Sequence, residues 1–246
     1  MNDTLKTIHS LRSIHFGFTS QEIKDEDLEL ILNASIRAAN ASNRQSYSII
    51  VLEDKKAIKE LSTSNCTKAL LFCIDSNRIM DTAKHIGNQY TVNHVDAFIT
   101  GTTDTNLAAQ TAAIAAKSLG IDSLFNSRIH RDIPKIYKLL ELPEKFCFPL
   151  IMLLLGYPKA EPDYKKERVS GPGIVHYNKY LRATDDELET LVQQYDDPHM
   201  GFFPNWKKKG YKHYLEWFFT KWCGSGIKKD GKSQMYKILE RTGYLE

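Results

Sequence analysis

The sequence predicts an α+β fold, organised as one large domain with a C-terminal extension. Short apolar runs typical of β-strands recur along the chain and alternate with segments of helical periodicity. A long Ala-rich segment lies among them, as expected for a helix that packs closely against a sheet. The chain has 246 residues, 42% of them hydrophobic, which is enough to bury a substantial core.

The helices are predicted from periodicity and from the residues at their ends. The helix that begins near residues 25–27, Asp-Glu-Asp, has negative charge where a helix N-terminus favours it, and its apolar residues then recur every three or four positions. The Ala-rich helix is predicted over residues 104–119, with Gly120 at the position of a C-terminal cap. Further helices are predicted over residues 1–10, 55–61, 136–140 and 185–195.

Four segments read as strands: residues 47–53, 69–74, 121–129 and 148–155. The last is continuously apolar, so both of its faces should be covered, as in the centre of a sheet. Residues 76–100 are polar and mixed, and the character of the chain changes again after residue 158. We therefore predict a first domain over residues 1–180 and a helical extension over residues 181–246.

An aromatic and basic segment, residues 206–222, has apolar residues at helical spacing. The simplest interpretation is a helix packed on the first domain or on a dimer mate. A helix at a membrane surface is the second interpretation, because basic and aromatic residues suit that interface. Nucleic-acid binding is the third, since the whole chain has a net charge of only +3.

Composition excludes several broad classes. The N-terminus has no apolar signal core, and the longest apolar run is far shorter than the ~20 residues of a membrane helix. The four cysteines form no C-x-x-C pair, so neither a zinc ribbon nor a redox dithiol is predicted. No two histidines have the spacing of a metal site, and none is expected. We expect a soluble cytoplasmic protein.

The chain also lacks the common nucleotide and hydrolase motifs. There is no G-x-G-x-x-G after a strand, no phosphate-binding P-loop, no G-x-S-x-G and no H-E-x-x-H. Instead, four polar clusters occur in a fixed order. They are L-R-S-I-H at residues 11–15, AANASNRQSY at residues 38–47, the Ala-rich helix from Asp104 with the following LGIDSLFNSR, and LLLGYP followed by K-K-E-R at residues 165–168.

The order of these clusters resembles the nitroreductase family of FMN-dependent oxidoreductases. The similarity covers about residues 8–178. It implies a nitroreductase-like fold, with a central, mostly antiparallel sheet flanked by helices, and an intertwined homodimer that binds FMN at its interface. The partners it implies are NAD(P)H and a small electron acceptor, without nucleic acid.

The resemblance assigns the cofactor phosphate to Arg12, Lys166 and Arg168, with Ser13 as an additional hydroxyl donor. It assigns the polar edge of the flavin to the loop at residues 38–47, which in the family reaches the flavin of the partner subunit. Amide and hydroxyl side chains suit the mixed donors and acceptors of that edge. The loop residues so assigned are Asn40, Ser42, Asn43 and Gln45. The alternative is that these side chains only satisfy the backbone of the loop.

Two departures from the family pattern bear on function. His15 replaces a residue that is always charged, so we hypothesise that the flavin potential depends on pH more than usual. Ser127 and Arg128 replace a pair of glycines whose amides face flavin N5, where Arg128 could crowd the site. Tyr90 and His94 are candidates for facing the substrate, because they lie in the variable stretch that covers the flavin in the family.

The expected reaction passes hydride from NAD(P)H through flavin N5 to a nitroaromatic, a quinone or a similar acceptor in a ping-pong cycle. The cofactor then supplies the chemistry, and no catalytic side chain is required. Two alternatives remain open. One is a reductive dehalogenase or flavin-degrading relative, and the other is a flavin-binding protein without efficient turnover.

Overall fold

The structure is a computed structural model that describes residues 1–15, 17–161, 165–171, 173–200, 203, 205–223 and 233–245. Its contacts divide the chain into two compact units. The first comprises Met1–Glu161 together with Lys232–Glu246, and the second comprises Pro162–Gly231. This division differs from the predicted boundary at residue 180, because the chain leaves the first unit soon after its last strand and returns to it at the C-terminus.

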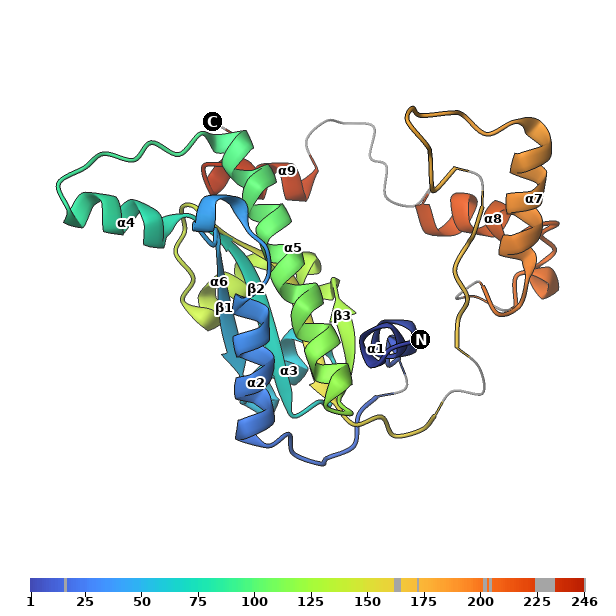
Figure 1. The fold of residues 1–246 in the computed structure, drawn as a ribbon, viewed down its shortest axis with the longest axis horizontal. Coiled ribbons are helices and arrows are strands. Elements are labelled where there is room, and N and C mark those ends of the chain that lie inside the picture. Colours follow the sequence, from blue (N-terminus) through green and yellow to red (C-terminus); the bar gives the residue numbers. More distant parts are fainter. Residues whose placement is uncertain are drawn as a thin grey trace. The chain divides into compact units, whose positions relative to one another are not determined.

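The sheet of the first unit is central and entirely antiparallel among its described strands, as predicted (Figure 1). The strand order is β1-β2-β4-β3. The strands are β1 (Tyr47–Leu52), β2 (Lys68–Asp75), β3 (Asp122–Asn126) and β4 (Cys147–Gly156). β2 and β4 occupy the two inner positions, which explains why their sequences are almost continuously apolar.

Helices cover both faces of this sheet, so the first unit has three layers (Figure 1). Leu70 and Phe72 of β2 face α2 and α5, whereas Leu71 and Cys73 face α3, α6 and the C-terminal segment. The helices are α1 (Asp3–Ser10), α2 (Asp25–Ile36), α3 (Lys55–Ser62), α4 (Asn77–His85), α5 (His94–Ser118), α6 (Ile133–Leu140) and α9 (Gln234–Arg241).

The predicted start of the Ala-rich helix at residue 104 is wrong, because α5 begins ten residues earlier, at His94. Its first part is rich in β-branched residues and contains Gly101, which hid the helical signal. Gly101 is required by packing: a Cβ there would lie 2.4 Å from Cγ2 of Ile74 on β2. The helix α4, within the stretch predicted only as polar and mixed, also escaped the sequence analysis.

The C-terminus forms part of the core of the first unit. Tyr244, which follows α9, is fully buried, and its hydroxyl donates a hydrogen bond to the carbonyl of Phe146 at 2.8 Å. The Phe146 amide donates in return to the carbonyl of Thr242 at 2.9 Å. The C-terminal segment therefore packs in the same layer as α3 and α6.

The second unit contains α7 (Asp185–Asp196) and α8 (Tyr214–Trp217), which continues as a π-helical turn over Phe218–Cys223. The helical spacing read across residues 206–222 is thus realised only in its second half. Gly210 adopts a left-handed φ of 84° and ends the short 3-10 turn Lys207–Lys209. Asp196 joins the two helices, since its carboxylate accepts from the Tyr214 amide at 2.7 Å.

Among the described residues, no helix has both the length and the apolar character needed to cross a membrane.

Candidate functional site

The loop between α2 and β1 has an unusual backbone for a segment without glycine or proline. Ser42, Asn43 and Gln45 adopt left-handed φ angles of 55°, 55° and 50°. Residues with a Cβ pay roughly 1–2 kcal/mol for this conformation, which short polar side chains offset through local hydrogen bonds. This backbone conformation is therefore costly, and other residues must hold the loop in place for it to persist.

Asp104, on α5, holds both ends of this loop. Its side chain is buried, with 1% of the residue exposed. Oδ1 accepts a hydrogen bond from the Ala41 amide at 2.9 Å, and Oδ2 accepts from the Ser46 amide at 3.2 Å. The sequence analysis noticed Asp104 only as the start of a helix. Its position about one turn before the first alanine pair gave no indication that it binds a loop about 60 residues earlier in the chain.

The four predicted loop residues have two different roles. Asn40 accepts from the Gln45 amide at 3.2 Å, and the Gln45 side chain donates to the Ile36 carbonyl at 3.4 Å. These two side chains thus serve the loop itself. The side chains of Ser42 and Asn43 are exposed and make no hydrogen bond within the described part of the chain. Only this second pair is available to a ligand without breaking an existing contact.

Two arginines that the sequence analysis missed also hold the loop. Arg78 donates to the backbone carbonyls of Arg44, at 2.9 Å, and Gln45. The Arg44 guanidinium in turn donates to the hydroxyl of Tyr90 at 3.3 Å. Tyr90 therefore lies beside the loop, and its contact with the substrate stays a prediction.

The second substrate-facing candidate, His94, lies elsewhere in the first unit. It begins α5, and its Nδ1 lies within hydrogen-bond distance of the Gly243 carbonyl near the chain end. Its ring centroid is 6.1 Å from that of Phe146. These contacts make His94 part of the packing between α5 and the C-terminal segment.

The segment at residues 11–15 runs alongside the start of β3. Ser13 forms a parallel bridge with Ser123, and the Ile14 amide donates to the Ser123 carbonyl at 3.1 Å. In an extended segment, successive side chains point to opposite faces. Ser13 and His15 are exposed, whereas Ile14 is buried and the Arg12 side chain is 17% exposed. The structure thus separates Arg12 from Ser13 and His15, which the sequence analysis had grouped together.

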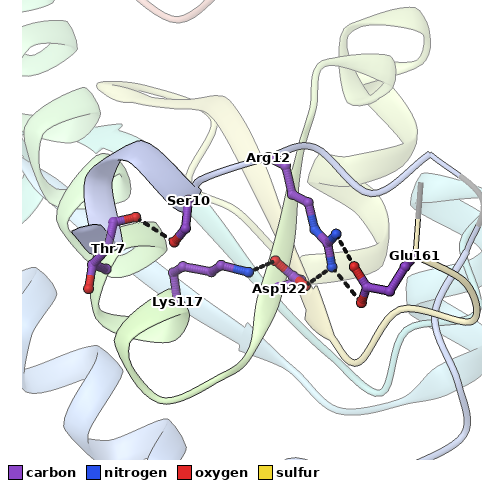
Figure 2. A network of polar contacts seen from close by, with 6 residues as sticks. All are labelled: Thr7, Ser10, Arg12, Lys117, Asp122 and Glu161. Atoms are coloured by element: carbon purple, nitrogen blue, oxygen red, sulfur yellow. Dashed lines mark hydrogen bonds and ion pairs between the residues drawn. The ribbon is translucent and has the colours of Figure 1, made fainter. Parts of the chain in front are cut away.

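Arg12 belongs to a network of four charged residues, which we call the Arg12 network: Arg12, Lys117, Asp122 and Glu161 (Figure 2). One Nη of Arg12 donates to Asp122 at 2.7 Å and to Glu161 at 2.9 Å, and the other donates to Glu161. Lys117 donates to the second oxygen of Asp122 at 2.7 Å. Two cations and two carboxylates therefore balance each other.

The electrostatics of this network favour its charged form. Hydrogen bonds to Glu161 and Asp122 raise the pKa of Arg12 above its ordinary value. Burial raises the pKa of the Asp122 carboxyl, but hydrogen bonds from Arg12 and Lys117 outweigh it, and the net pKa is lowered. The hydrogen bond from Arg12 likewise lowers the pKa of Glu161. The Nε of Arg12 is buried and has no hydrogen-bond partner in the described residues.

The pair predicted to face flavin N5 follows β3. Ser127 and Arg128 are exposed, and the Arg128 amide donates to Oδ1 of Asn126 at 2.8 Å. Asn126 also donates to the Ser62 carbonyl at 3.2 Å, so this turn is tied to the end of α3. A ligand that needs the Arg128 amide would have to replace the Asn126 side chain.

Next to this turn lies an open pocket of about 210 Å³. An ion pair between Lys135 and Glu60, 2.9 Å apart, lies at this pocket. The residues that line it are Glu60, Leu61, Thr63, Arg128, Ile129, Arg131, Asp132, Lys135 and Ile136. The pocket is therefore mixed in charge and does not by itself indicate a ligand.

The remaining predicted phosphate ligands, Lys166 and Arg168, lie in the second unit. Arg168 donates through one Nη to the carbonyls of Lys166 and Glu167 at 3.2 and 3.1 Å, and within the described residues its other nitrogens make no hydrogen bond. Burial, and then the nearby charge of Arg168, lower the pKa of Lys166. An added anion would relieve this repulsion between the two cations.

The chain matches known proteins over most of its length. A family model described as the Nitroreductase family matches residues 8–157. An FMN reductase (NAD(P)H) of Bacillus subtilis is 30% identical over 207 residues, which are 80% of this chain and 81% of the relative. An oxygen-insensitive NADPH nitroreductase of Salmonella typhimurium is 30% identical over 205 residues, with the same two coverages of 80% and 81%.

The fold also matches solved structures. The structure of NfrA2 from B. megaterium aligns with a TM-score of 0.82 at 26% sequence identity. The alignment covers 99% of this chain and 98% of that one. The similarity therefore includes both units and not only the residues matched by the family model.

Proposed function

The chain belongs to the nitroreductase family, and on that basis we propose that it is an FMN-dependent oxidoreductase that takes electrons from NAD(P)H. The main support is agreement between sequence and fold. Relatives that share about four-fifths of their length with it are named as an FMN reductase and an NADPH nitroreductase. The proposed acceptor is a small molecule such as a nitroaromatic or a quinone.

The side chains of the α2–β1 loop fit the polar edge of a flavin. Ser42 and Asn43 are exposed, lack hydrogen bonds within the described residues, and stand on a loop that Asp104 holds from behind. Because the backbone of this loop is already held, little ordering of the backbone would be needed on binding, which favours affinity. When bound, FMN would supply the centre that accepts and then donates hydride.

The other residues of the proposed site would bind and orient. Ser13 and His15 are exposed and lie on the side of the N-terminal segment opposite the buried Ile14, and they would contact the cofactor from there. Lys166 and Arg168 would neutralise the phosphate, for which a paired lysine and arginine are well suited. The turn at Ser127 and Arg128 and the side chain of Tyr90 would border the acceptor.

We also propose that the active form is a homodimer. Large apolar side chains are exposed on α2 and α5, which cover one face of the sheet. They are Leu30, Ile36, Ile99 and Leu107, with exposed fractions of 56%, 49%, 59% and 42%. A second copy of the chain would cover this surface. Light scattering on the purified protein measures its molar mass and so tests whether it is a dimer.

We propose that the protein acts in the cytoplasm, because its reaction would consume NAD(P)H.

Steady-state kinetics test the proposed activity. The FMN-loaded protein should oxidise NADPH or NADH only when an acceptor is present, and double-reciprocal plots at several acceptor concentrations should be parallel, as for a ping-pong cycle. A panel of a nitroaromatic, a quinone and free FMN would rank the acceptors. A protein that binds FMN but oxidises neither nucleotide with any of them would instead be a flavin-binding protein without turnover.

A further inference from the structure

We propose that Arg12 is a positioning residue: the Arg12 network fixes the segment at residues 11–15 so that Ser13 and His15 face the cofactor, and Arg12 itself does not bind the phosphate. The inference rests on the proposed function, because it concerns the same FMN site. It differs from what the sequence alone implies, which is that Arg12 is one of three phosphate ligands.

The direction of the Arg12 side chain is the first argument. The segment is extended beside β3, so Arg12 and Ile14 point to one face and Ser13 and His15 to the other. Ile14 is 5% exposed and belongs to the core, which fixes this orientation. Turning Arg12 outward would bury His15 and expose Ile14, because a rotation of the segment moves all its side chains together.

The charges around Arg12 are the second argument. Both of its Nη atoms already donate to carboxylates, as Figure 2 shows. A phosphate near them would lie next to Asp122 and Glu161, and like charges at such distances repel. Asp122 cannot move away easily, since only 5% of its side chain is exposed and Lys117 holds its other oxygen.

The network also connects the elements that need to be aligned. Lys117 lies in the last turn of α5, Asp122 is the first residue of β3, and Glu161 follows β4. Arg12 joins the N-terminal segment to all three through these partners. Among the described residues, the segment also contacts β3 through the bridge between Ser13 and Ser123, in which the Ile14 amide donates to the Ser123 carbonyl. The network therefore attaches the N-terminal segment at a second point, in addition to its contact with Ser123.

Glu161 is the member of the network that can be tested most cleanly. Its side chain is 72% exposed, so in Glu161→Gln the new amide group can turn to solvent while the remaining oxygen still accepts from Arg12. A matched control exists in the same unit: Glu144, 79% exposed, pairs with Arg241 at 3.3 Å. Glu144→Gln removes an exposed carboxylate from a similar ion pair in a different place.

The experiment measures the Kd of FMN for the full-length apoprotein by quenching of flavin fluorescence. Glu161→Gln should weaken FMN binding about two- to fivefold, the size expected for a partly exposed ion pair, whereas Glu144→Gln should leave it unchanged. Arg12→Gln should weaken binding further, and adding Glu161→Gln to it should have no additional effect, since the two residues act through one contact. In the apoprotein, the Ile14 amide should also exchange its hydrogen faster in Glu161→Gln than in the wild type.

The sign of the Glu161→Gln effect is decisive. If Arg12 bound the phosphate, removing the competing carboxylate would tighten FMN binding, and that result would overturn the proposal. Unchanged affinity, or unchanged exchange at Ile14, would overturn it as well. These failures are distinct from a failure of the proposed function, which would appear as a wild-type apoprotein that does not bind FMN at all. Glu161→Gln alone carries the test if Arg12→Gln does not fold.

Discussion

The Asp104 carboxylate offers a direct test of how the α2–β1 loop is held. In Asp104→Asn, one oxygen remains to accept a backbone hydrogen bond, but the new amide group faces the second N–H as a donor. Ala41 and Ser46 provide those two N–H groups, and the one from Ser46 lies on a buried residue. A lost charge-assisted bond and an unsatisfied buried donor cost about 1–3 kcal/mol each, so we expect a destabilisation of about 2–6 kcal/mol.

The assay is equilibrium unfolding in urea, followed by far-UV circular dichroism. Tryptophan fluorescence is not suitable, because all three tryptophans lie at residues 206–222, in the second unit, whereas Asp104 lies in the first. The control is Asn106→Ala, an exposed position on the same helix, which should change stability by less than about 0.5 kcal/mol. The FMN affinity of Asp104→Asn should fall too, since Ser42 and Asn43 depend on this loop.

The result that would refute this reasoning is a free energy of unfolding for Asp104→Asn equal to that of the control. The loop would then be held by its own side chains, and the two hydrogen bonds to Asp104 would contribute nothing measurable. If Asp104→Asn weakened FMN binding without lowering stability, Asp104 would act on the binding site alone. That result would contradict its proposed role in stabilising the loop.

Three further predictions concern packing, pH and the loop. Gly156→Ala places a Cβ 2.8 Å from the Phe18 ring, so it should lower the free energy of unfolding by about 1–3 kcal/mol; an unchanged urea midpoint would contradict this contact. Because its cationic partners lower its pKa, Asp122 stabilises the fold above about pH 4 and loses this contribution on acidification. Urea midpoints of the wild type should therefore fall more steeply between about pH 5 and 3 than those of Asp122→Asn, and parallel curves would refute this. Asn40→Ala should lower the thermal midpoint, because it removes a hydrogen bond within the loop. Asn43→Ala should change only the Kd of FMN. If Asn43→Ala lowered the thermal midpoint and Asn40→Ala changed only the Kd, the roles assigned to the two side chains would be wrong.

The sequence predicted the sheet and most helices of the first unit correctly. The continuous apolar run at residues 148–155 indicated a strand covered on both faces, and β4 is an inner strand of the sheet. The acidic residues at 25–27 indicated the start of a helix, and α2 begins at Asp25. These elements carry their signal locally, in the pattern of side chains that must be buried or that favour a helix end.

The elements that were missed depend on distant contacts. The N-terminal half of α5 contains a glycine and β-branched residues, and it is helical because it packs against β2. The final helix, α9, was not predicted either. Its place in the core becomes clear only from Tyr244, whose hydroxyl bonds a residue 98 positions earlier.

The candidate site shows the same limit. The residue types of the loop indicated hydrogen bonding, but not that Asn40 and Gln45 bond the loop itself while Ser42 and Asn43 stay exposed. The partners of Arg12 lie 110 and 149 residues away, beyond the reach of any local pattern. The sequence thus indicated residue types that are chemically suited to binding, and only the fold could show which of the predicted residues already had partners.

The visible spectrum of the purified protein tests the central claim most directly. With FMN bound, the flavin band should bleach when NADPH or NADH is added without oxygen, and denaturation should release FMN. That result would establish the cofactor and the first half of the reaction in one experiment. A protein that stays colourless and cannot be loaded with FMN would contradict the proposed function, although its fold would still be that of the family.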